Sequence, residues 1–222
     1  MTLRQMRNPS IANHTKASGQ ERAGDGPQDP ALDRRLKSLL ARSRIIPAVR
    51  SEADLELAAR SSSAIVYLLC GSLSNLDHLA QVLHYAEKEI MVNLDLFSGL
   101  ARDSHAVAFL AASGIAGIIS THVDVLSAAR SHGLFSIQRT FIIDSVSVES
   151  SFRSLRRFVP DALELLPALA APRILHQLRA VHQDIATIAG GLIASIKEAD
   201  ELVAAGIDAV SIGNPQMWQL PS

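Results

Sequence analysis

Apolar and polar positions form two distinct patterns along this chain from about residue 44 onward. Short, nearly continuous apolar runs are separated by longer segments in which leucine and alanine recur every three or four positions. The short runs are typical of parallel strands that are covered on both faces, and the longer segments are typical of amphipathic helices. The apolar runs occupy residues 44–49, 64–70, 90–96, 116–120, 134–139, 162–167, 185–190 and 208–213.

Glycines and capping residues mark the ends of the helices expected between these runs. Gly114, Gly133 and Gly206 stand at helix C-termini, where a left-handed residue is favoured, and Ser195 and Glu198 have the spacing of a capping box. Eight strand–helix units on 222 residues predict an α/β fold, a small (β/α)8 TIM-type barrel with an abbreviated last helix. A doubly wound parallel sheet is the alternative.

The first part of the chain has a different pattern. Residues 1–31 contain almost no periodic apolar positions, and such a segment buries too little surface to offset the entropy of ordering. We therefore expect a flexible N-terminal tail over residues 1–31. Leu32, Leu36, Leu39 and Leu40 then recur at helical spacing, so residues 32–222 are expected to form a single barrel domain.

Composition narrows the class of function. The formal net charge of -1 gives no overall basic field for nucleic acid, and the single cysteine, Cys70, excludes a disulfide framework. The histidines lack the i, i+4 pairing of a helical metal site, so we expect neither a metal nor a cofactor. The apolar runs are too short to span a bilayer. We expect a cytoplasmic protein that does not bind membranes, and the sequence leaves open whether it is a homo-oligomer.

Glycines and small polar residues follow the seventh and eighth apolar runs. In a (β/α)8 barrel the loops after these two strands commonly bind phosphate, because backbone N–H groups and helix N-termini face the anion there. The alternative is that the paired glycines simply form a tight turn. The residues predicted to bind phosphate are Gly190, Gly191, Ser211, Gly213 and Asn214.

Polar side chains also stand at the ends of the other runs. The residues predicted to line the mouth of the barrel are Arg50, Asp95, Thr121, His122, Gln138, Arg139 and Glu164. Their carboxylates would accept hydrogen bonds from ligand hydroxyls, and their arginines would add positive potential. Alternatively, the charged members close an ion-pair network that stabilises only the fold. Strand alternation places Asn93 and Asp95 on the same side of the third strand.

No catalytic constellation is evident, since the sequence contains no nucleophile-elbow pattern and no Ser-His-Asp arrangement. Arg153, Arg156 and Arg157 form one basic face at the end of a predicted helix. This face is either a contact for RNA phosphates or ordinary solvated helix charge.

Several blocks of this sequence resemble, in order and spacing, the glycerol uptake operon antiterminator family. The blocks are IPAVRSEADLELA, NLDLFSGLARD, GIISTH, SIQRTFIIDS, LELLP, IAGGLI and AVSIGN, and the resemblance extends over about residues 45–218. It implies a (β/α)8 regulator that binds leader RNA of glycerol-utilisation genes in response to glycerol 3-phosphate and so prevents premature termination. The phosphate would then lie against residues 190–191 and 211–214, and the hydroxyls would face Asp95 and Glu164.

The sequence departs from the family pattern at several of these positions. The family usually has histidine at position 93, arginine at 122 and 194, and small hydroxyl residues at 212 and 213. The residues found there are Asn93, His122, Ala194, Ile212 and Gly213. Each charged hydrogen bond removed costs about 1–3 kcal/mol, so we expect a changed ligand or a changed affinity.

Two other functions fit the same fold. The first is an enzyme that acts on a small phosphorylated polyol or triose, with Asp95 or Glu164 as general base. The second is a ligand-binding barrel that signals to a protein partner without RNA binding or turnover.

Overall fold

The eight apolar runs form a closed barrel of parallel strands. The computed structural model describes residues 29–218, and its strands pair in chain order, with β8 closing on β1. The strands are β1 (Ile45–Val49), β2 (Ile65–Leu68), β3 (Glu89–Asn93), β4 (Gly117–Ser120), β5 (Phe135–Phe141), β6 (Ala162–Leu166), β7 (Ala186–Gly190) and β8 (Ala209–Ile212). The fold is therefore a (β/α)8 barrel, which confirms the prediction and excludes the doubly wound sheet.

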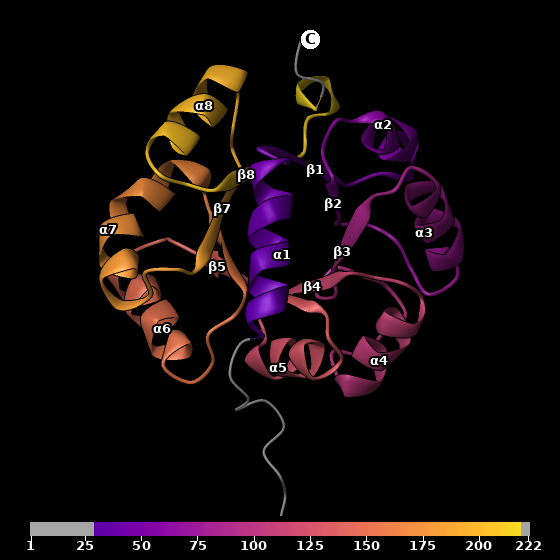
Figure 1. Ribbon diagram of the computed structural model, residues 1–222, viewed down its shortest axis with the longest axis horizontal. Coiled ribbons are helices and arrows are strands. Elements are labelled where there is room, and N and C mark those ends of the chain that lie inside the picture. Colours follow the sequence, from indigo (N-terminus) through magenta and orange to yellow (C-terminus); the bar gives the residue numbers. More distant parts are fainter. Residues whose placement is uncertain (1–28, 219–222) are drawn as a thin grey trace, which may run out of the picture.

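Helices surround this barrel, as Figure 1 shows. They are α1 (Pro30–Ala41), α2 (Leu55–Arg60), α3 (Leu76–Tyr85), α4 (Ser104–Ala112), α5 (Val123–Ser131), α6 (Ser145–Leu155), α7 (Ala171–Val181) and α8 (Ile196–Ala204). Three short 3-10 turns are η1 (Glu52–Asp54), η2 (Ala168–Ala170) and η3 (Pro215–Met217). Within the described residues only η3 follows β8, so the last helix is abbreviated as expected.

Strand alternation sorts the buried side chains into two clusters. The outward-facing residues pack beneath the surrounding helices. The inward-facing residues fill the barrel, and they include Ile46, Tyr67, Met91, Ile119, Ile137 and Ile188. The interior is therefore a packed core, and a ligand can enter only at an open end.

Helix α1 closes one end of the barrel, and it lies across the centre of Figure 1. Its Leu36, Leu39 and Leu40 join the inward-facing cluster. Arg35 pairs with Glu89 at 2.5 Å and stacks over the ring of Phe135 at 5.1 Å, and these two partners are the first residues of β3 and β5. Helix α1 thus covers the N-terminal end of the strands and leaves the C-terminal end open.

Local signals in the sequence correspond to the observed helix ends. Gly114, Gly133 and Gly206 follow helices with φ values of +76°, +72° and +97°, as predicted. The Ser195 hydroxyl caps α8 by accepting from the N–H of Glu198 at 3.2 Å. The Glu198 carboxylate accepts from the N–H of Ala194 rather than that of Ser195, so the capping box is only half formed.

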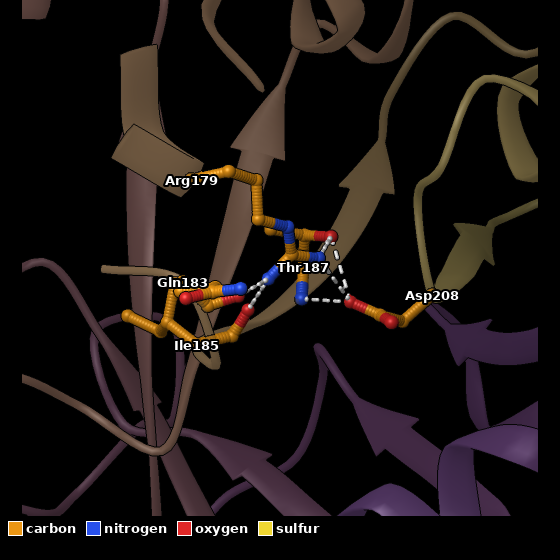
Figure 2. Close-up of polar contacts among 5 residues, drawn as sticks. All are labelled: Arg179, Gln183, Ile185, Thr187 and Asp208. Atoms are coloured by element: carbon orange, nitrogen blue, oxygen red, sulfur yellow. Dashed lines mark hydrogen bonds and ion pairs between the residues drawn. The ribbon is translucent and has the colours of Figure 1, made fainter. Parts of the chain in front are cut away.

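A polar clamp fixes the N-terminal ends of β7 and β8 (Figure 2). The Asp208 carboxylate accepts from the backbone N–H and the hydroxyl of Thr187, at 2.7 and 2.8 Å. Arg179, at the end of α7, donates to Asp208, Thr187 and the carbonyls of Gln183 and Ile185. This clamp fixes the relative position of the two strands that were predicted to hold phosphate.

The same arrangement recurs one pair of strands earlier. The carboxylate of Asp161, just before β6, accepts from the N–H and the hydroxyl of Ser136 of β5, at 2.8 and 2.7 Å. Arg130, at the end of α5, lies 3.9 Å from this carboxylate. Two consecutive strand pairs are therefore aligned by equivalent contacts, although the sequence shows no obvious repeat.

Two boundaries differ from the sequence prediction. Helix α1 begins at Pro30 and is capped by Asp29, so residues 29–31 belong to the barrel domain; the expected flexible segment otherwise lies outside the described residues. Strand β3 ends at Asn93, and Asp95 lies in the turn that follows, so strand alternation does not place its side chain. Within residues 29–218 no helix has the length and apolar character needed to cross a bilayer.

Candidate functional site

A cavity of about 290 Å³ opens at the C-terminal end of the strands, opposite α1. Side chains and loops of β1, β2, β5, β6, β7 and β8 surround it. The predicted site residues that line it are Arg50, Arg139, Glu164, Gly191, Ser211, Gly213 and Asn214. The structure therefore brings together most of the predicted phosphate residues and the arginines, which came from separate parts of the sequence.

A buried ion pair forms the floor of the cavity. The Nε of Arg139 donates to one oxygen of Glu164 at 2.7 Å, and the hydroxyl of Ser211 donates to the other at 2.8 Å. The side chain of Glu164 is only 1 % exposed, so its oxygens are satisfied by these two protein contacts rather than by bulk water. The terminal nitrogens of Arg139 make no hydrogen bond to the described residues and remain available as donors.

The glycines around the cavity are required by different contacts. A Cβ on Gly190 would lie 2.4 Å from the Ser211 hydroxyl and 3.1 Å from the Glu164 carboxylate, so this glycine supports the floor and does not line the cavity. Gly191 has a φ of +78°, which side chains rarely adopt. A Cβ on Gly213 would lie 3.0 Å from Nε of Arg50. Contacts within the protein thus account for Gly190, and they also favour a glycine at position 213.

Arg50 supplies the positive charge that the cavity does not balance. Its side chain lies over Gly213, is exposed, and forms no ion pair with any described residue. Because the charge of Arg139 is offset by Glu164, the cavity carries a net positive charge that comes from Arg50. An arginine in this setting favours phosphate or carboxylate, to which it can donate two parallel hydrogen bonds.

The helix termini beside the cavity are already capped by protein groups. The N–H groups of Ala194 and Glu198, at the start of α8, donate to Glu198 and Ser195. The Asn214 side chain accepts from the N–H of Gln216 at 3.1 Å. A phosphate here would therefore rely on Arg50 and the backbone near residues 191–193 more than on a free helix N-terminus.

Asp95 belongs to a separate cluster and does not line the cavity. Its carboxylate accepts from the hydroxyl of Ser120 at 2.6 Å and from the N–H and hydroxyl of Thr121 at 2.7 and 2.8 Å. Arg102 lies 3.8 Å away. His122 is the N-cap residue of α5, and its exposed side chain makes no capping hydrogen bond. The four charged mouth residues therefore do not close a single network.

Two further sets of predicted site residues lie away from the cavity. Gln138 lies on the outer face of β5, where its amide donates to Ser154 of α6 at 3.1 Å, so it is not a mouth residue. Its position follows from alternation, because its neighbour Arg139 faces inward. Arg153, Arg156 and Arg157 are exposed at the end of α6, which lies at the covered end of the barrel, away from the cavity.

Sequence reasoning missed the apolar residues that line the cavity and one tyrosine beneath it. Leu69, Leu192 and Ile193 line it, and Leu192 has a φ of +61°. Tyr67 lies inside the barrel below it, fully buried. Burial and the nearby Glu164 carboxylate raise the pKa of the Tyr67 phenol, and Arg139 lowers it only in part. Alternation along the second apolar run could have identified Tyr67, because it places this side chain inside the barrel.

The acidic group among the described residues that line the cavity is Glu164, and it is already paired. Both oxygens of Glu164 already accept hydrogen bonds, so this carboxylate is a poor general base. No lysine is among the described residues that line the cavity, so none can form a Schiff base there. Residues 29–218 contain no group of three His, Cys, Asp or Glu side chains that could hold a metal ion.

Comparison with known proteins identifies the family. Residues 45–218 match the family model described as glycerol-3-phosphate responsive antiterminator. The chain belongs to this family. The Escherichia coli (strain K12) protein YgcP, described as uncharacterized, is 32 % identical over 187 residues, covering 83 % of this chain and 96 % of that protein.

Solved structures of antiterminator proteins share the fold. The glycerol uptake operon antiterminator regulatory protein of Listeria monocytogenes has 30 % identity and a TM-score of 0.73, covering 78 % of this chain and 94 % of its own. A glycerol uptake operon antiterminator-related protein of Thermotoga maritima has 25 % identity and a TM-score of 0.72, covering 79 % and 98 %. Aldolases and decarboxylases at 13–18 % identity share the fold alone.

Proposed function

We propose that this member of the antiterminator family binds glycerol 3-phosphate in the cavity at the open end of the barrel. The observation that carries the proposal is the Arg50 guanidinium, which lines the cavity and has no ion-pair partner among the described residues. A phosphate dianion would balance this charge and accept hydrogen bonds from Arg50, from the terminal nitrogens of Arg139 and from the backbone at Gly191. The description of the family supports the same ligand.

We further propose that the regulated partner is leader RNA of glycerol-utilisation genes. The antiterminator description of the family supports an RNA partner. Arg153, Arg156 and Arg157 are the candidate contacts, since they are exposed and form no ion pair with any described residue. They lie at the opposite end of the barrel from the cavity, so the ligand would influence RNA binding through the barrel rather than by touching RNA.

The same cavity supports a regulator better than an enzyme. An enzyme acting on a phosphorylated triose or polyol would need a free base, but Glu164 is paired with Arg139 and Ser211. Asp95 accepts three hydrogen bonds and does not line the cavity. No observation favours turnover, and binding without chemistry accounts for every group at the floor.

Transcription in vitro through the leader of a glycerol-utilisation gene from the same genome tests this function. We expect the protein and glycerol 3-phosphate together to increase read-through past the leader terminator. Arg50→Met should remove the response to the ligand, while Arg102→Met, at an arginine paired with Asp95 outside the cavity, should retain it. Read-through that is the same with and without glycerol 3-phosphate for the unchanged protein contradicts the proposal.

A further inference from the structure

Two polar side chains inside the barrel make no hydrogen bond to any described residue. The amide of Asn93 leaves both its oxygen and its nitrogen unpaired, and the hydroxyl of Tyr67 is unpaired as well. Asn93 is 1 % exposed and Tyr67 is 0 % exposed. Buried polar groups in proteins are nearly always hydrogen-bonded, so two unpaired groups in one region require an explanation.

Both side chains lie inside the barrel on adjacent strands, and Tyr67 lies close to the Glu164 carboxylate of the cavity floor. Asn93 shares the inward parity of Met91, two positions earlier on β3, and Met91 is paired with Tyr67 of β2. The printed pairing ends with Leu68 opposite Val92, and Asn93 and the cavity-lining Leu69 each follow that last pair by one residue. Asn93 and Tyr67 thus lie on two adjacent strands, at and just below the level of the cavity floor.

The chemistry of this pair selects a neutral partner. The Asn93 amide offers one acceptor and two donor hydrogens, and the Tyr67 hydroxyl offers one donor and an acceptor. Neither group carries a charge, and the ionised side chains of the cavity floor, Arg139 and Glu164, already neutralise each other. A carboxylate or a second phosphate here would be buried without a countercharge, whereas a hydroxyl would both donate and accept.

We propose that Asn93 and Tyr67 form a hydroxyl-binding subsite that takes the polyol end of a phosphate monoester. The inference rests on the proposed phosphate site at Arg50, because the ester must be held there for its other end to reach inward. It replaces the expectation that ligand hydroxyls face Asp95. Since Asn93 is 1 % exposed, a hydroxyl reaches it only after a neighbouring side chain such as Leu69 changes rotamer.

The subsite predicts that the protein distinguishes esters of equal charge by their hydroxyls. Calorimetric titration would compare glycerol 3-phosphate with n-propyl phosphate, which carries the same phosphate and no hydroxyl. We expect the unchanged protein to prefer glycerol 3-phosphate by about tenfold or more, because an unpaired polar site rejects an analogue that lacks the hydroxyl. Asn93→Leu and Tyr67→Phe should each reduce this ratio while retaining affinity for n-propyl phosphate.

Thr140→Val provides the matched control. The Thr140 hydroxyl is also buried and unpaired, but it lies on the outward-facing side of β5, between the strand and the helices. Its loss should change stability and leave the affinity ratio unaltered. The ratio is measured on folded protein, so a loss of folded material in one variant does not alter it, and two independent variants are available.

The outcomes separate the two proposals. If both esters bind the unchanged protein and the ratio is the same in Asn93→Leu, in Tyr67→Phe and in the unchanged protein, the subsite is wrong and the phosphate site stands. If neither ester binds the unchanged protein, the phosphate site is wrong and the subsite falls with it. A ratio that changes equally in Thr140→Val also overturns the subsite, because the effect would then be general.

Discussion

Arg139 holds the charge of Glu164 inside the barrel, and this pair sustains the shape of the cavity floor. Arg139→Met leaves the carboxylate buried without its cation, so we expect the free energy of unfolding to fall by about 3–5 kcal/mol. Arg102→Met, which removes an exposed pair with Asp95 at 3.8 Å, should cost no more than about 1 kcal/mol. Urea unfolding measures the free energy of unfolding of both variants. Equal losses would show that the buried Arg139–Glu164 pair stabilises the fold no more than the exposed pair does.

The buried phenol of Tyr67 makes the free energy of unfolding depend on pH in the alkaline range. Its folded-state pKa is raised, so its contribution is fully present below the unfolded pKa near 10 and is lost as the pH rises toward the folded value. Above about pH 10 the free energy of unfolding should fall by up to about 1.4 kcal/mol per pH unit because of this residue. Tyr67→Phe should remove that slope. Tyr85→Phe, at a tyrosine that is 95 % exposed, should leave it unchanged.

Residue type and position predicted the arginines, the glycines and Ser211 at the cavity, but not the direction of every side chain. Asp95 stands two residues beyond the end of β3, where strand alternation no longer fixes the direction of a side chain. Gln138 alternates outward because Arg139 faces in. The sequence could not show which of two adjacent polar residues points into the barrel, since that depends on where the strand begins and ends.

Among the elements, helix α1 covers the N-terminal end of the barrel and packs against its core. Leu36 is fully buried there, so Leu36→Ala should lower the free energy of unfolding by about 2–5 kcal/mol. Lys37→Ala on the same helix removes only an exposed i,i+4 pair with Asp33 and should cost less than about 1 kcal/mol. Equal, small losses in chemical unfolding would mean that α1 does not stabilise the barrel.

The order of strands and helices could be predicted from the sequence because buried parallel strands and amphipathic helices have different periods. The clamps formed by Arg179 and Asp208, and by Arg130 and Asp161, could not. Each joins the end of a helix to two strands, and the sequence separation within a clamp differs from one to the other. Contacts of this kind become visible only when the strand register is known.

For the whole molecule, the two ends of the barrel have different roles in our proposal. The open end holds the ligand, and Arg153, Arg156 and Arg157 are exposed at the covered end. Changing these three arginines to glutamate should weaken leader-RNA binding and lower the slope of log K against log salt by about 2, at roughly 0.7 per phosphate contact. Fluorescence anisotropy at several salt concentrations measures this slope.

Binding of glycerol 3-phosphate to the same triple variant should be unchanged, because its substitutions lie at the opposite end of the barrel. An unchanged salt slope would place the RNA contacts on another surface. A loss of ligand affinity together with RNA affinity would indicate a folding defect rather than a lost contact.

Ligand binding in this cavity is tested most directly by calorimetric titration of the protein with glycerol 3-phosphate, with glycerol and inorganic phosphate as controls. We predict saturable binding of the ester, none of glycerol, and a loss of about tenfold or more in affinity for Arg50→Met but not for Arg102→Met. No binding at millimolar glycerol 3-phosphate, or equal affinity in Arg50→Met and the unchanged protein, would contradict the assignment of this cavity.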